Sequence, residues 1–129
     1  VQKAVLLAAL ARAAGIPARL GFCNVRNHLL SKQILDGLRS DNVMKYHGYA
    51  LLHLGGRWIK ATPSFDIELC HQHNFIPVEF DGTADAVFHR CNTEGKLHME
   101  YVHDHGIYDE VPWEEILASR DWLQPEQRS

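Results

Sequence analysis

The sequence lacks a long hydrophobic run and an excess of positive charge. Its longest uninterrupted apolar run covers residues 4–11 and ends at Arg12, whereas a membrane-spanning helix needs about 18 or more such residues. Thirteen lysines and arginines against 16 aspartates and glutamates give a net charge of −3. Such a chain has no broad basic field to hold a phosphate backbone. We therefore expect neither a membrane nor a nucleic acid among its partners.

The sequence also has few cysteines, and none of them forms a Cys-x-x-Cys pair. Cys23, Cys70 and Cys91 are odd in number and widely spaced, which argues against a disulfide framework. Unpaired cysteines are typical of a reducing compartment, so we predict a cytoplasmic protein. We interpret each of the three as a small buried apolar side chain.

What the sequence does contain is enough for one domain. Its 129 residues are 46% hydrophobic and 22% charged, an ordinary mixture for a compact domain. The first residue is Val1 rather than methionine, and an apolar helical pattern begins at once with no capping residue before it. We therefore interpret residues 1–129 as a single domain truncated at its N-terminus. No feature of the sequence indicates an oligomeric state.

Hydrophobic patterning predicts an α+β fold in which a helix precedes antiparallel strands. Residues 1–14 are apolar around most of a helix circumference, which is typical of a core helix. Residues 43–54 are the clearest strand, and Gly55-Gly56 predicts a hairpin to a strand at 57–61. The other predicted elements are a strand at 18–26, a helix at 28–40, a short strand at 78–80, a hairpin of 86–91 and 97–103, and a helix from Pro112 to Leu123.

Three short motifs follow one another in the first half of the chain. Residues 12–19 form an Arg-x-x-Gly-Ile-Pro-Ala-Arg turn after the first helix. Residues 45–49 place a histidine within a strand, and residues 58–63 run from a tryptophan to a Thr-Pro pair on the next strand. Each motif is weak alone, but their order and spacing together are more specific.

This arrangement resembles the core of the transglutaminase-like superfamily of cysteine enzymes over about residues 1–66, and residues 77–112 resemble a bacterial subfamily of it. The resemblance implies a papain-like α+β fold with the N-terminal helix packed on the antiparallel sheet. It implies cysteine-dependent acyl transfer, by hydrolysis or transamidation, on a protein, peptide or amide substrate. It requires neither a metal nor an organic cofactor.

The resemblance also implies where the nucleophile lies. The family's cysteine begins the first helix, and alignment on the turn motif puts it immediately before Val1, a position that none of the three cysteines occupies. A helix N-terminus and a nearby imidazolium activate a thiol by lowering its pKa. The chain as it stands is therefore expected to be catalytically inactive, whatever its parent protein does.

His47 is the residue that we expect to pair with this cysteine. Without the surrounding motifs, such a histidine would be interpreted as a core residue satisfied by a neighbour. Alternation along the strand divides its side chains between two faces. One face carries Lys45, His47, Tyr49, Leu51 and His53, and the other carries Met44, Tyr46, Gly48, Ala50, Leu52 and Leu54.

The third catalytic group, which would orient the imidazole, has two candidates. A symmetric hairpin pairs Leu54 with Arg57 and puts Thr62 diagonal to His47 on one face; Thr62 also stands where the family has its aspartate. A hydroxyl can orient an imidazole but cannot supply the negative charge that stabilises an imidazolium. Asp66 supplies that charge, although it can instead cap the turn that follows it.

Two further functions remain open. The absent cysteine and the threonine at the aspartate position favour a non-catalytic binding or scaffold module on the same fold. Nine histidines favour a metal-binding domain, with ligand-type residues at 70–73, at His98 and at 103–105. Neither group has the spacing of a known zinc site, so surface histidines are the simpler interpretation.

Overall fold

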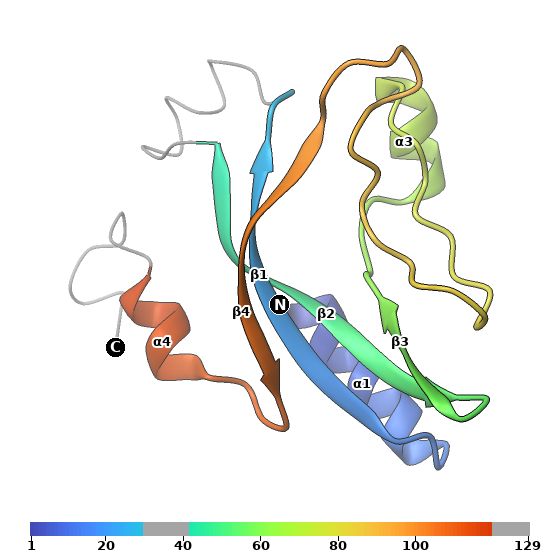
Figure 1. The fold of residues 1–129 in the computed structure, drawn as a ribbon, viewed down its shortest axis with the longest axis vertical. Coiled ribbons are helices and arrows are strands. Elements are labelled where there is room, and N and C mark those ends of the chain that lie inside the picture. The colour runs from blue at the N-terminus through green and yellow to red at the C-terminus, as the bar shows by residue number, and fades with distance from the viewer. Residues whose placement is uncertain (30–41, 120–129) are drawn as a thin grey trace.

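The computed structural model describes residues 1–29 and 42–119. Its centre is an antiparallel four-stranded sheet in the order β3-β2-β1-β4 (Figure 1). The predicted α+β class is confirmed. The strands are β1 (Ala18–Asn27), β2 (Val43–Leu54), β3 (Arg57–Ala61) and β4 (Met99–Tyr108), and the helices are α1 (Gln2–Ala13), α3 (Ile67–His73) and α4 (Trp113–Ala118).

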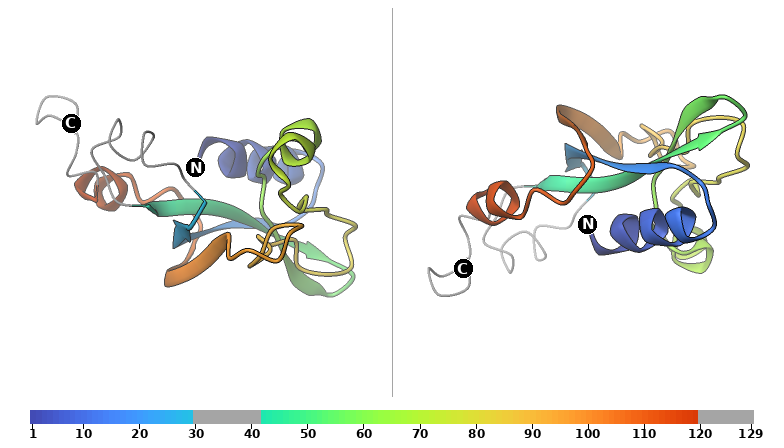
Figure 2. Two further views of the ribbon diagram at one scale, coloured as in Figure 1. Left: turned by 90° about the horizontal axis from the view of Figure 1, so that it is seen from above. Right: turned by 90° about the horizontal axis from the view of Figure 1, so that it is seen from below.

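Small side chains let α1 pack closely on the sheet. Ala4, Ala8 and Ala11 are buried and recur on one face of the helix. In the edge-on views of Figure 2, α1 covers one side of the sheet, as predicted. The helix is not buried around most of its circumference, however, because Leu6 and Leu10 are 61% and 60% exposed. The alanines are the buried residues of this contact, and the partly buried Val5 and Leu7 also pack against it. Leu6 and Leu10 lie on the outward face.

The sheet separates two hydrophobic clusters. The first joins α1 to the sheet through Phe22 and Leu52. The second lies on the other face and joins Val25 and Leu51 to Phe88, which comes from the loop before β4. Phe22 and Val25 are completely buried, and burying a side chain of this size contributes roughly 1.5–3 kcal/mol of transfer free energy. Both faces of the central strands are therefore needed for the core.

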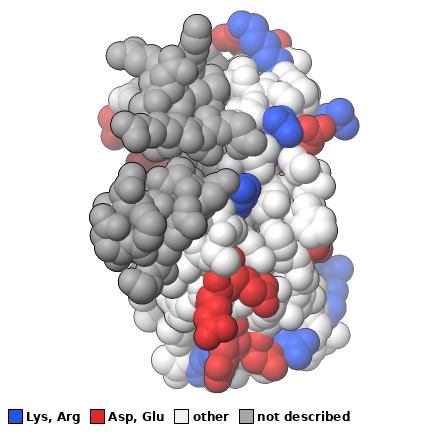
Figure 3. All heavy atoms as spheres, turned by 90° about the vertical axis from the view of Figure 1, so that its left-hand side faces the viewer, with Lys and Arg blue, Asp and Glu red and all other residues white. Residues whose placement is uncertain are grey.

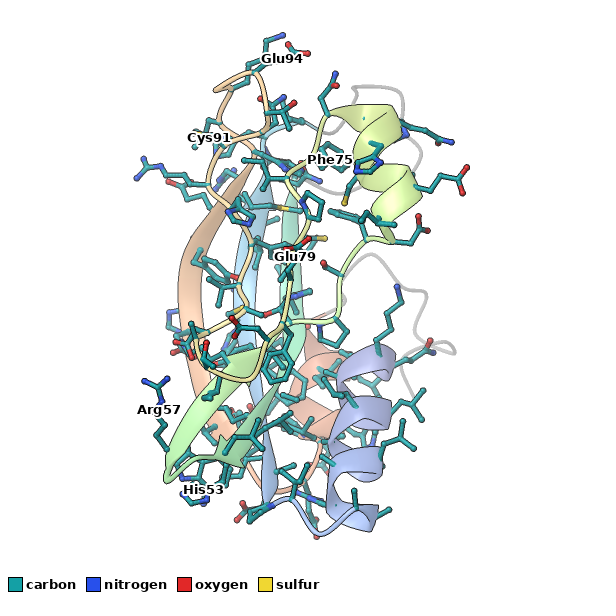
Figure 4. All side chains as sticks on the ribbon, turned by 90° about the vertical axis from the view of Figure 1, so that its right-hand side faces the viewer. His53, Arg57, Phe75, Glu79, Cys91 and Glu94 are labelled. Atoms are coloured by element: carbon teal, nitrogen blue, oxygen red, sulfur yellow. The ribbon has the colours of Figure 1, made fainter. Side chains whose placement is uncertain are left out.

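The β2–β3 hairpin forms in the predicted register. Leu54 lies opposite Arg57, and the pairing continues in step to Ala50 opposite Ala61. Pairing stops there because Pro63, which follows closely, has no N–H to donate to a ladder. Figure 4 shows the turn of this hairpin, with His53 and Arg57, at the opposite end of the molecule from Cys91 and Glu94.

Strand β2 contains an irregularity that strict alternation does not predict. Cys23 lies opposite His47, but Val25 lies opposite Met44, so two residues of β2 oppose one residue of β1. This is a β-bulge, and Tyr46 within it has a φ of 54°. Met44 consequently packs with Val25 in the second cluster rather than on the face that carries Tyr46, which corrects the predicted alternation.

Elements later in the chain differ from their predictions. Residues 78–80 form no strand. Residues 86–91 and 97–103 form no hairpin and share a single bridge between Cys91 and Leu97. Residues 99–103 of the second segment belong instead to β4, which pairs with β1. This pairing satisfies the backbone of the second edge of β1, and it joins segments too distant in sequence for a local pattern to reveal.

The predicted C-terminal helix is present as α4, and Pro112, predicted as its first residue, is instead the N-cap residue before Trp113. The extension of this helix toward Leu123 and most of the predicted helix at 28–40 lie outside the described residues. Glu114 and Glu115 lie in the first turn of α4, where negative charge is favoured. Figure 3 shows acidic side chains gathered on the side of the molecule where α4 lies. No helix within the described ranges is long and apolar enough to cross a membrane.

Candidate functional site

His47 follows the bulge of β2 and lies on the face of the sheet that carries the second cluster. Its ring centroid lies 4.8 Å from that of Phe88. Its Nε2 atom is shielded from solvent and has no hydrogen-bond partner among the described residues. Burial lowers the pKa of His47 to about 4. The imidazole is therefore neutral at pH 7.

The amino end of α1 lies against β2 beside His47. A Cβ atom built on Gly48 would lie 3.2 Å from the Cα of Val1, so the absence of a side chain at Gly48 permits this close approach. Lys3 donates a hydrogen bond of 3.0 Å to the carbonyl of Ser64, which ties the first turn of α1 to the segment after β3. The amino end of a helix carries partial positive charge, which stabilises an anion placed there.

The end of β3 leaves part of β2 without a strand on one side. Within the described part of the chain, β2 pairs with β3 only from Ala50 to Leu54. The stretch that contains His47 therefore has β1 as its strand neighbour. Because α1 contacts both this stretch and the segment after β3, the helix end, the histidine and that segment belong to one region of the molecule.

Thr62, the first candidate for the orienting group, is the residue after β3 and is 7% exposed. Its N–H donates a bond of 3.0 Å to the carbonyl of Ala86, and its side chain lies near the phenol of Tyr101. Its role in orienting the imidazole stays a prediction.

Asp66, the second candidate, is the N-cap residue of α3. Its Oδ1 atom accepts a bond of 2.8 Å from the N–H of Leu69, and the residue is exposed. This is the capping role that the sequence left open as an alternative. No carboxylate of the described residues is among the groups that shift the pKa of His47. The orienting role of Asp66 likewise stays a prediction.

A cavity of about 400 Å³ opens on the same face of the sheet. It is lined by side chains from all four strands and from the loop before β4, among them Cys23, Tyr49, Lys60, Asp85 and Asp104. The Lys60 ammonium lies 5.4 Å from the centroid of the Tyr49 ring. Sequence reasoning missed this cavity, because Asp85 and Asp104 reach it through pairings that no local pattern reveals. Alternation did place Tyr49 on the face of His47.

The cysteines of the chain are free thiols. Cys23 and Cys70 are 3% and 1% exposed, as predicted for small buried side chains, whereas Cys91 is half-buried. Burial raises the pKa of Cys23 to about 12, and the nearby negative charge of Asp104 acts in the same direction. Cys23 is therefore a neutral thiol at pH 7, although it lies opposite His47 across the β1–β2 pair.

The histidine-rich segments do not converge on a metal site in the described ranges. No three or more His, Cys, Asp and Glu side chains in those ranges are arranged to hold a metal ion. His98 is buried and stacks on Phe75, with ring centroids 4.2 Å apart. His105 stacks on Tyr46 at 3.9 Å. Several histidines thus serve as flat packing surfaces.

Comparison with known proteins gives one match. Residues 1–63 match the family model described as the transglutaminase-like superfamily. These residues include α1, the Gly-Ile-Pro-Ala-Arg turn, the strand of His47 and the residue pair Thr62-Pro63. No curated protein and no solved structure matches the chain.

Proposed function

We propose, since residues 1–63 carry the transglutaminase-like core, that the chain supplies the histidine and the substrate-binding face of a cysteine acyl-transfer site. The nucleophile in this proposal is a cysteine immediately before Val1, at the amino end of α1. The substrate is a protein, peptide or other amide, and the acceptor is water or an amine. The chain without that cysteine is inactive, and its free thiols suit a reducing compartment such as the cytoplasm.

One observation carries the proposal. His47 has a shielded Nε2 atom with no hydrogen-bond partner among the described residues, and the amino end of α1 lies against the neighbouring Gly48. A buried imidazole nitrogen without a partner is costly unless another group reaches it. A thiol on the residue before Val1 would extend from the helix end that already touches Gly48.

The chemistry follows from these positions. His47 takes the proton of the thiol, and the helix end stabilises the thiolate that results. The sulfur attacks the amide carbonyl carbon, a C–S bond forms, and the C–N bond breaks as the imidazolium returns the proton to the departing amine. Water or an amine then attacks the thioester and gives its proton to His47. The C–S bond breaks, and the thiolate is regenerated.

The residue that precedes Val1 in the parent sequence provides the first test. Cysteine there supports the proposal, and alanine, serine or glycine overturns it. The second test uses the chain with its preceding residues restored. Iodoacetamide should alkylate that cysteine selectively, with an apparent thiol pKa well below 8, and His47→Ala should abolish this selectivity. His71→Ala, which changes an exposed histidine on α3, is the control.

A non-catalytic binding module is the second candidate, and Thr62 favours it. Thr62 stands where the family has its aspartate, and its neutral hydroxyl supplies no negative charge to an imidazolium. Thr62→Asp distinguishes the two functions in the extended chain. If the site is catalytic and lacks only this charge, the variant should increase thiol reactivity. A binding module should show no reactivity in either form.

A further inference from the structure

Asn24 in β1 is the point at which the sheet loses regular register on both sides. Toward β2, the partner shifts from His47 for Cys23 to Met44 for Val25. Toward β4, the register shifts twice, once between Phe22 and Cys23 and once between Asn24 and Val25. Strand β4 therefore also carries extra residues there. Bulges of this kind change the direction of a strand and re-aim its side chains, and they are frequent next to active sites.

The extra residue of β2, Tyr46, is held in a conformation that an aromatic residue rarely adopts. Its φ of 54° lies in the left-handed region, which costs a non-glycine residue on the order of 1 kcal/mol or more. Such strain persists only where the surroundings hold it. Here the surroundings are specific. The Tyr46 N–H donates to Oδ1 of Asn24 at 3.1 Å, and its hydroxyl donates to Glu115 at 3.2 Å.

His105, one of the extra residues of β4, completes the arrangement. His105 donates from Nε2 to the same Oδ1 atom of Asn24 at 2.7 Å. Its ring stacks on that of Tyr46, with centroids 3.9 Å apart and planes 9° from parallel. One amide oxygen thus accepts hydrogen bonds from both bulges, and the two bulged residues pack face to face.

His47 is the next residue in the chain after Tyr46. The Nε2 atom of His47 has no hydrogen-bond partner among the described residues. The position of the imidazole ring is therefore set by its packing on Phe88 and by the backbone conformation of the preceding residue, Tyr46. We propose that Asn24, with the Tyr46–His105 stack, is a positioning residue for His47: it holds the left-handed turn from which the imidazole is aimed. The proposal rests on the proposed function only in that His47 is the residue being aimed.

The test measures the pKa of His47 by NMR titration of the histidine ring nitrogens in the chain as it stands. Asn24→Ala removes the shared acceptor, so the strand relaxes, the ring gains solvent, and the pKa should rise by about one unit toward its ordinary value. Asn24→Asp keeps the acceptor oxygen and should retain the low value. Asn92→Ala is the matched control, because the Oδ1 atom of Asn92 also accepts two hydrogen bonds, from the N–H groups of Glu94 and Lys96, in a turn elsewhere.

An unchanged His47 pKa in a folded Asn24→Ala variant overturns the proposal, and so does an equal rise in Asn92→Ala, which would indicate general loosening. If Asn24→Ala does not fold, His105→Phe keeps a ring for stacking, removes the bond to Asn24, and should raise the pKa in the same direction. In the extended chain, Asn24→Ala should slow alkylation of the cysteine before Val1 by about tenfold or more. Absence of that reactivity in the unsubstituted chain counts against the proposed function alone, because the titration needs no nucleophile.

Discussion

The environment of His47 makes the stability of the fold depend on pH. Its pKa of about 4 in the fold lies below the ordinary value near 6.5 of an unfolded chain. Between these two values the unfolded state binds more protons than the folded state, so stability decreases as the pH falls. The expected slope approaches about 1.4 kcal/mol per pH unit for one such group. Urea unfolding between pH 7 and about 4 measures it.

His47→Gln should flatten this dependence over the same pH window. Burial also lowers the pKa of His98, so His98→Gln should remove a second part of the slope, and the double variant should remove both. Carboxylates that titrate in this range are common to all four proteins and cancel in the comparison. A His47→Gln variant whose slope equals that of the unsubstituted chain would show that the imidazole is not buried as described.

Gly21 is expected to tolerate no side chain, because the ring of Tyr49 lies directly over it. A Cβ atom built on Gly21 would overlap ring atoms of Tyr49, its partner across the β1–β2 pair. Overpacking of this kind costs roughly 1–3 kcal/mol, so Gly21→Ala should lower the free energy of unfolding by that amount in urea titrations. Combining it with Tyr49→Ala removes the clash. The double variant should lose less stability than the sum of the two single variants.

The sequence identified single residues best where a motif surrounded them. His47 and Thr62 were selected because they stand within spaced motifs, and their catalytic roles stay predictions. The cap at Asp66 was recognised because carboxylates prefer helix ends. The contacts of Asn24 and Tyr101 were not foreseen. Each is bonded to partners distant in sequence, Tyr46 and His105 for Asn24 and the N–H of Phe88 for Tyr101. A residue type alone does not name its partners.

Among the elements, α3 offers the sharpest prediction, because a single residue caps it. Asp66 accepts from Leu69 at 2.8 Å, so Asp66→Ala should cost about 1 kcal/mol of stability. Asp66→Asn keeps the acceptor and should cost only a few tenths. Denaturant unfolding of the two variants measures the difference, and equal losses would show that charge rather than capping matters at this position.

The same two variants decide whether Asp66 also orients His47. An orienting carboxylate stabilises the imidazolium, so its removal should lower the pKa of His47 in both variants. A residue that only caps α3 should leave that pKa unchanged in Asp66→Asn. The capping geometry favours the second outcome, and NMR titration of His47 measures it.

Helices and strands were predictable where residues close in sequence determine them, and were missed where distant residues do. The register of the β2–β3 hairpin followed from two glycines between strands, and α1 followed from its composition. β4 was not predicted as a neighbour of β1, because its pairing depends on chain closure over a long loop. The bulge at Tyr46 escaped the period-two pattern because it is fixed by Asn24 and His105, and not by the residues around it.

At the scale of the whole molecule, the two faces of the sheet have different roles: one packs against a helix, and the other carries the residues of the proposed chemistry. One face packs on α1 through a small-residue contact, and the other carries His47, the cavity and the thiol of Cys23. Near the end of β3, the amino end of α1 reaches the strand of His47. There α1 approaches Gly48, and Lys3 donates a hydrogen bond to the carbonyl of Ser64. The first half of the chain accordingly holds the residues proposed for catalysis, and the second half supplies the cover of the cavity.

The rates at which the three cysteines are alkylated measure how readily each part of the fold opens to solvent. The same rates test the assignment of the nucleophile. Cys91 is half-buried and should be alkylated first under native conditions. Cys70 is the buried residue of the short helix α3, and only a local opening of that helix is needed to expose it. Cys23 lies in β1, which is hydrogen-bonded to strands on both sides, and its pKa of about 12 removes most of its thiolate at neutral pH. It should be alkylated last.

Pulses of iodoacetamide followed by peptide mass spectrometry give this order directly. Low urea concentrations should accelerate labelling of Cys70 before that of Cys23, because opening β1 requires the sheet itself to separate. Labelling of Cys23 as fast as that of Cys91 in the native chain would contradict the burial of its thiol. It would also make Cys23, which lies opposite His47, a competitor for the role that we assign to a cysteine before Val1.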